Sequence, residues 1–173
     1  MISSIRAFWA GILAALLNHV LNFGLAIALS AAAPTLPFLS VLATVSLNPV
    51  TSPLCKFVVS GLIDRKSLWG AFLLSLPSTL LFAIYFEREG SLNGEKLAII
   101  ALTHFSTSAI IAAFRGGPVR LLYAIGVHFA ISLATSYLGQ MPGVAVAVAC
   151  TLAVLVAKIR TPRLTAEHSR WRS

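Results

Sequence analysis

The feature that most constrains this chain is a succession of long apolar blocks with hardly a charged residue inside them. They run over residues 8–33, 36–63, 68–86, 97–114, 121–138 and 141–159. A helix needs roughly 20 apolar residues to cross the hydrocarbon core of a bilayer. Only 10% of the residues are charged, which is too few to cover a water-facing globule. We therefore predict an all-α, polytopic membrane helix bundle of six short transmembrane helices.

The connectors between the blocks alternate in charge. Ten of the 13 Lys and Arg residues fall on one side of the predicted membrane, and only Arg88 and Lys96 fall on the other. Cytoplasmic loops carry the excess of Lys and Arg. We therefore predict that both termini are cytoplasmic. No N-x-S/T sequon occurs, and we place the multi-pass chain in a bacterial inner membrane.

The same charge pattern bears on domains and partners. Residues 1–160 are predicted to form a single transmembrane domain, and residues 161–173 a basic cytoplasmic tail. This tail either is disordered without a specific partner or contacts anionic lipid headgroups. The net charge of +8 does not indicate a nucleic-acid partner, because the basic residues stand singly or in pairs at block ends. An alternative is that residues 8–33 form a cleaved signal peptide, but this block is about twice the length of a usual apolar signal region.

Polar side chains gather near mid-depth in several of the predicted crossings. His19, His104 and His128 each lie close to the midpoint of their own crossing, and Ser132, Thr135 and Ser136 continue a polar stripe from His128. A polar group buried in hydrocarbon is costly unless it has a partner. We expect these side chains to face inward and to line one pocket, although each histidine could instead make a structural hydrogen bond. The candidate substrate-binding residues are Asn18, His19, Asn22, Asn48, Lys56, His104 and His128.

The second block contains two prolines at this depth. Pro49 and Pro53 each remove a backbone donor, so we predict a helix broken at Asn48–Pro53, with a simple kink as the alternative. Discontinuous helices at the midplane commonly form the binding sites of transporters. Lys56 lies one turn further along, where it would either extend to the cytoplasmic interface or face an anionic solute.

Small residues recur at helical spacing in two blocks. One stripe consists of Ala7, Gly11 and Ala15, and the other of Ala145, Ala149, Ala153 and Ala157. Small residues let membrane helices approach closely. We expect both stripes to pack within the bundle. The alternative for the second is docking of another membrane subunit or a second copy.

The sequence offers little for catalysis. No carboxylate lies inside a predicted crossing, and no HExxH, GxSxG or Walker-type motif occurs. Cys55 and Cys150 are expected to be packing residues. We expect no catalytic residue, no metal site, no resident cofactor and no enzymatic activity.

Three functional hypotheses remain, in order of preference. The first is a small-solute transporter or transporter subunit with a polar mid-membrane site. The second is a non-catalytic subunit or assembly factor of a larger membrane complex. The third is a membrane protein that binds haem b or a transition metal through histidines, since imidazole is a ligand for both.

Overall fold

A computed structural model gives an all-helical chain, with 93% of it in helices. The structure describes residues 2–32, 37–63, 67–114 and 117–170. Within these ranges, it describes only the backbone of residues 2, 23, 26, 29, 30, 32, 37–47 and 161–170. The described part of the chain contains no strand.

The described ranges contain six α-helices. They are α1 (Ile2–Ala32), α2 (Pro37–Val59), α3 (Leu68–Arg88), α4 (Gly94–Ala113), α5 (Gly117–Leu133) and α6 (Gln140–Arg170). A 3₁₀ turn (Ser60–Leu62) extends α2, and a π-helical turn (Ala134–Leu138) extends α5. The predicted helix boundaries lie within about four residues of these, except that α1 begins before residue 8 and α6 continues past residue 160.

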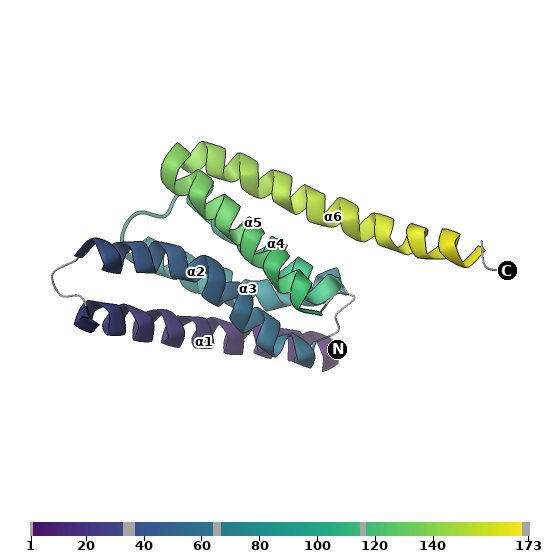
Figure 1. Cartoon of the computed structure of the whole chain (residues 1–173), viewed down its shortest axis with the longest axis horizontal. Coiled ribbons are helices and arrows are strands. Elements are labelled where there is room, and N and C mark those ends of the chain that lie inside the picture. Colours follow the sequence, from purple (N-terminus) through teal and green to yellow (C-terminus); the bar gives the residue numbers. More distant parts are fainter. Residues whose placement is uncertain (1, 33–36, 64–66, 115–116, 171–173) are drawn as a thin grey trace.

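Among the described residues, five segments are long and apolar enough to cross a membrane, namely those in α1, α3, α4, α5 with its π-helical turn, and α6. The α2 helix, part of which is described only as backbone, runs beside them. The described part of the chain is therefore a helix bundle, and its five long apolar helices support the membrane location that the apolar blocks predict. Both termini lie at one end of the bundle, and the α3–α4 and α5–α6 connections lie at the other (Figure 1).

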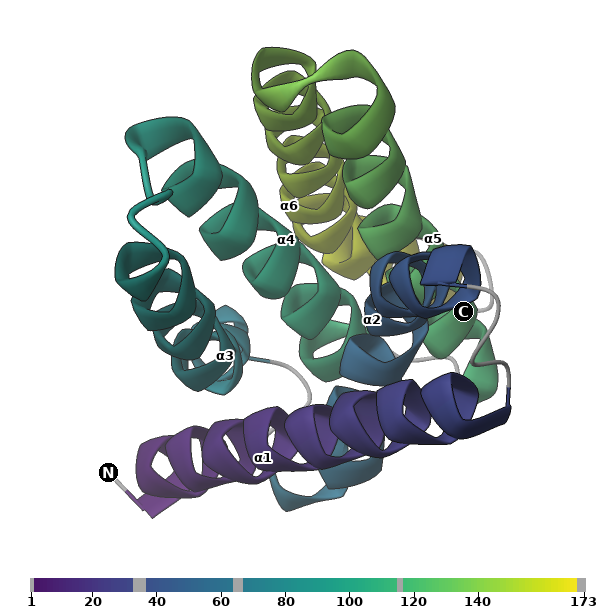
Figure 2. The same cartoon turned by 90° about the vertical axis from the view of Figure 1, so that its left-hand side faces the viewer.

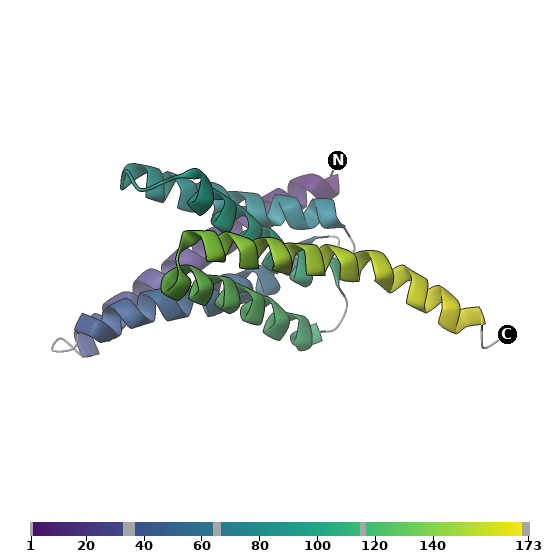
Figure 3. The same cartoon turned by 90° about the horizontal axis from the view of Figure 1, so that it is seen from above.

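The α4 helix lies at the centre of the bundle. It contacts α2, α3, α5 and α6, and most of its residues from Thr103 to Ala113 are buried. The α1 helix packs across α2 and α3 on one side (Figure 2). On the other side, α6 packs on α4 and then projects beyond the bundle (Figure 3). Because α4 contacts four helices, its polar residues have the most neighbouring helices with which they can form hydrogen bonds. The predicted headgroup contact of residues 161–173 lies outside the described side chains.

The predicted break in the second helix is wrong. The α2 helix is continuous through Pro49 and Pro53, although it bends partway along its length (Figure 1). Residues four apart lie on one face, so the two missing N–H donors weaken only one side of the helix. Both proline side chains are fully buried, which covers that weakened side with protein.

The two small-residue stripes differ in burial. In α1, Ala7 and Ala15 are buried, and a Cβ at Gly11 would lie 2.8 Å from the carbonyl oxygen of Leu74 in α3. This stripe packs within the bundle, as expected.

In α6, the expectation of packing within the bundle is wrong, because all four alanines of the stripe are exposed: Ala145, Ala149, Ala153 and Ala157. A second small face of α6, with Gly143, Ala147 and Thr151, turns inward instead. This face is favoured because the Thr151 hydroxyl lies 2.7 Å from that of Ser106, which gives both groups a partner.

Candidate functional site

Lys56 is the least expected member of the bundle core. Its side chain is only 1% exposed. Its Nζ lies 3.1 Å from each of three acceptors, the His104 Nδ1, the His104 carbonyl oxygen and the Thr107 hydroxyl. An ammonium has three N–H donors, so each one has a partner. The alternative that Lys56 extends to the membrane interface is wrong, because the central helix supplies these acceptors inside the bundle.

The contact with Lys56 determines which atoms of Thr107 and His104 accept a hydrogen bond. The Thr107 hydroxyl donates to the Thr103 carbonyl at 2.9 Å, which leaves its oxygen free to accept from Lys56. When Lys56 is an ammonium, which can only donate, the Nδ1 of His104 accepts. The neutral imidazole of His104 then carries its hydrogen on Nε2, the nitrogen that Lys56 does not contact.

His128 of α5 stands edge-on to His104. The two ring centroids lie 5.9 Å apart with an interplanar angle of 86°. His128 is 3% exposed, and its buried Nδ1 has no hydrogen-bond partner in the part of the chain that the structure describes. A buried polar atom without a partner costs free energy, so native proteins rarely leave one without a reason. A bound ligand or water would supply the missing partner.

A cavity of about 220 Å³ adjoins both histidines, and we call it the histidine pocket. It extends from the histidines toward the end of the bundle that holds the α3–α4 and α5–α6 connections. Its polar lining residues are Asn48, Thr103, His104, His128, Ser132, Thr135 and Ser136, and the others are Pro49, Phe82, Phe86, Ile99, Ile100 and Ile131. Residues of four helices, α2 to α5, therefore meet at one cavity.

The π-helical turn after α5 supplies two of the polar lining residues, Thr135 and Ser136. The wider turn changes which side chains face the bundle, and such turns are frequent at functional sites. The Thr135 hydroxyl donates to the Ile131 carbonyl at 2.8 Å. A Cβ at Gly143 of α6 would collide with the Thr135 side chain, so glycine is needed there.

Asparagines join α1 to α2 beside the pocket. The Nδ2 atoms of Asn18 and Asn22 donate to the Oδ1 of Asn48 at 3.1 and 3.3 Å. The Thr51 hydroxyl lies 2.8 and 2.9 Å from the Oδ1 atoms of Asn18 and Asn22. This cluster holds the bent part of α2 against α1. Of its members, Asn48 also lines the histidine pocket.

The structure thus brings the seven predicted site residues to different places. Asn48, His104 and His128 line the pocket, while Lys56, Asn18 and Asn22 stand behind it. His19 does not reach the pocket. It is exposed, and its ring stacks on that of Phe82 with the centroids 6.0 Å apart, while the Phe82 and His104 ring centroids lie 5.3 Å apart. Asn18 and His19 are neighbours in α1, and only Asn18 faces inward, where it has three polar partners.

Sequence reasoning gave too little weight to the pocket's other residues. Ser132, Thr135 and Ser136 follow His128 at steps of three and four along the chain, and this polar stripe was the signal for them. Phe82, Phe86 and Ile131 form the apolar wall. Nothing distinguishes them in the sequence from lipid-facing residues.

Two other cations bind the end of α4. Arg120 donates through Nη1 to the Ile111 carbonyl and lies 4.9 Å above the ring of Phe57. Lys158 donates to the Ala113 carbonyl at 2.7 Å. The last carbonyls of a helix lack intrahelical donors and carry partial negative charge, so cations stabilise them. Arg120 and Lys158 therefore have structural roles as helix caps.

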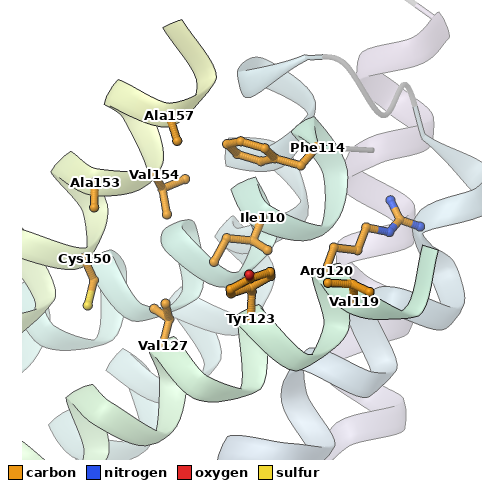
Figure 4. Close-up of a pocket in the computed structure, with 10 residues that line it drawn as sticks. All are labelled: Ile110, Phe114, Val119, Arg120, Tyr123, Val127, Cys150, Ala153, Val154 and Ala157. Carbon is orange, nitrogen blue, oxygen red and sulfur yellow. The ribbon is translucent and has the colours of Figure 1, made fainter. Parts of the chain in front are cut away.

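A second and larger cavity, of about 390 Å³, lies between α5 and α6 (Figure 4). We call it the α5–α6 groove. Its lining is almost wholly apolar, and the Arg120 guanidinium points away from it (Figure 4). The lining residues are Ile110, Phe114, Val119, Arg120, Tyr123, Val127, Cys150, Ala153, Val154 and Ala157. Such a surface suits lipid chains or another helix.

Metal ligands are sparse among the described residues, where no group of three or more His, Cys, Asp and Glu side chains could hold a metal ion. In comparisons with protein-family models, with curated proteins and with solved structures, nothing matches this chain.

Proposed function

We propose that this protein is a small-solute transporter or transporter subunit and that the histidine pocket is its solute site. One observation carries the proposal. The buried Nδ1 of His128 has no hydrogen-bond partner among the described residues, although the side chain lines a cavity of the helix bundle. Polar and ionisable side chains within a membrane are expensive, and they commonly mark solute pathways.

The backbone around the pocket supports a site that can change shape. On one side, α2 lacks the two N–H donors of Pro49 and Pro53, and on the other, α5 ends in a π-helical turn. Both features weaken the regular i to i−4 hydrogen bonds of a helix. Irregular helices near mid-depth commonly form the solute sites of secondary transporters.

The proposal includes an orientation. We place the protein in a bacterial inner membrane with both termini in the cytoplasm, which puts the α3–α4 connection outside. The alternation of Lys and Arg along the chain supports this orientation. A reporter fused at Asn93 should read external and one at Ser173 cytoplasmic. A cytoplasmic signal at Asn93 would contradict the orientation.

The test of the solute site uses the full-length protein, purified in mild detergent and screened against a panel of small solutes for thermal stabilisation. Solutes that stabilise it are then followed by uptake into proteoliposomes. His128→Ala should weaken solute binding by about tenfold or more, which corresponds to ~1.4 kcal/mol. The control is His19→Ala, because His19 is exposed and outside the pocket. Equal binding by the wild type and His128→Ala would contradict the assignment.

A second candidate function is that of a non-catalytic subunit or assembly factor in a larger membrane complex. The outward-facing alanine stripe of α6 favours it, because Ala153 and Ala157 of this stripe also line the α5–α6 groove. Small exposed residues beside a groove would admit a partner's transmembrane helix at close range.

Purification in mild detergent tests this candidate. It predicts a stoichiometric partner protein that is lost in Ala149→Leu or Ala153→Leu, while the isolated chain remains stable. Unchanged complex size in both variants would show that the stripe faces only lipid.

A further inference from the structure

We infer that the histidine pocket selects a small organic anion, with Lys56 as its counter-charge and the Nε2–H of His104 as its donor. This inference rests on the proposed function, because it names the class of solute for the same site.

The first feature that favours an anion is the charge of Lys56. Its three acceptors, two on His104 and one on Thr107, are all neutral, so they satisfy its N–H donors without cancelling its charge. No ion pair joins Lys56 to a carboxylate within the described part of the chain. A charge inside a membrane is normally paired. An anion in the adjoining pocket would provide this pairing.

The second feature that favours an anion is the imidazole of His104. Lys56 donates to its Nδ1, so the hydrogen of the neutral ring is on Nε2, and the same side chain lines the pocket. A donor whose far side is bound to a cation is polarised, and it binds an anionic acceptor more strongly than a neutral one. Lys56 therefore acts on the solute through His104 and does not need to touch it.

The other residues that line the pocket are also suited to a negatively charged solute. It contains no carboxylate, and the Ser132 and Ser136 hydroxyls have no hydrogen-bond partner among the described residues, so they can donate to a ligand. Toward the connection end of the pocket, the Lys96 ammonium lies 5.1 Å from the ring centroid of Phe86, a lining residue. The acids of that connection, Glu87, Glu89 and Glu95, do not line the pocket.

Size and shape narrow the class of anion. A volume of about 220 Å³ corresponds to roughly seven water molecules at ~30 Å³ each. The other lining residues are apolar, among them Phe82, Ile99 and Ile131. A small monocarboxylate with an apolar body would find partners of both kinds in this lining. A cation would be repelled by Lys56, and a neutral polar solute would gain nothing from its charge.

The experiment compares isosteric pairs that differ in charge. Binding of benzoate and benzamide, and of acetate and acetamide, is measured by calorimetry on the full-length protein in detergent. The wild type should bind at least one carboxylate about tenfold or more tightly than its amide. In Lys56→Met, the difference within that pair should fall to about twofold. Lys158→Met is the matched control, because Lys158 bonds only the end of α4, and it should keep the wild-type preference.

The outcomes separate the inference from the proposed function. If an amide binds as tightly as its carboxylate, the anion inference is wrong and the solute site stands. If neither pair binds, the anion inference is also wrong, and the broader solute screen decides separately on the proposed function. Because the wild-type comparison needs no variant, it remains decisive even if Lys56→Met fails to fold. Lys56→Arg then tests whether a retained charge retains the preference.

Discussion

The α5–α6 groove and the histidine pocket differ in size and in the polarity of their lining. The α5–α6 groove is the larger, at about 390 Å³, and it is lined by apolar side chains of neighbouring helices. The histidine pocket is about 220 Å³ and has seven polar side chains in its lining. Lipid can fill an apolar groove at no cost, whereas buried polar groups need a partner. In this setting, polarity is a better guide to a solute site than volume.

The largest effect should come from removing the acceptor of Lys56. His104→Leu leaves one N–H of a buried ammonium without its partner, and a hydrogen bond to a charged group is worth about 1.5–3 kcal/mol. We expect a loss of unfolding free energy in this range, together with loss of solute binding, measured by denaturant unfolding in mixed micelles. The groove control, Val127→Ala, should cost about 1 kcal/mol. Wild-type stability in His104→Leu would mean that Lys56 finds water and is not held in the core.

A second comparison uses two alanines of α6 that lie two residues apart. Ala147 is fully buried against the bundle, and Ala149 is exposed on the outward stripe. Ala147→Leu should destabilise the isolated protein by about 1–3 kcal/mol, because overpacking forces backbone shifts. Ala149→Leu should change the unfolding midpoint very little. Equal losses in both variants would show that α6 is rotated relative to the structure described here.

A smaller effect is expected at the asparagine cluster behind the pocket. Thr51→Val removes the hydroxyl that lies within 2.9 Å of the Oδ1 atoms of Asn18 and Asn22. The loss should be about 1 kcal/mol in unfolding free energy, the value of an ordinary buried hydrogen bond. Thr79→Val is the control, since its hydroxyl bonds only the Ser75 carbonyl of its own helix. If the two variants lose the same stability, the cluster does not join α1 to α2 as described.

The depth of polar residues was predictable, but helix rotation was not. The lengths of the apolar blocks predicted the helix bundle. The shared depth of His104, His128 and Asn48 predicted that they line one pocket. The rotation of a helix about its own axis depends on which of its faces finds partners inside the bundle. Thus Asn18 turned inward and its neighbour His19 did not, and α6 used the face of Ala147 and not that of Ala149. A pattern of small residues fits either face equally well.

Lys56 and the two prolines show a second limit. From the sequence, a long cationic stem next to a membrane interface is expected to extend out of the bundle. The three acceptors that hold it inside come from α4, about fifty residues away along the chain. The continuity of α2 likewise depends on the burial of Pro49 and Pro53 by other helices. Such long-range partners leave no local signal.

The most direct test of the solute site is access of water to the two cavities. In a background with Cys55→Ala and Cys150→Ala, single cysteines are placed at Ser132 in the histidine pocket and at Val127 in the α5–α6 groove. A charged, water-soluble thiol reagent should label Ser132→Cys, and a bound solute should slow this labelling. Val127→Cys should resist that reagent and react only with a lipid-soluble one. Labelling of Val127→Cys by the charged reagent, with Ser132→Cys unreactive, would contradict the assignment of the histidine pocket as the solute site.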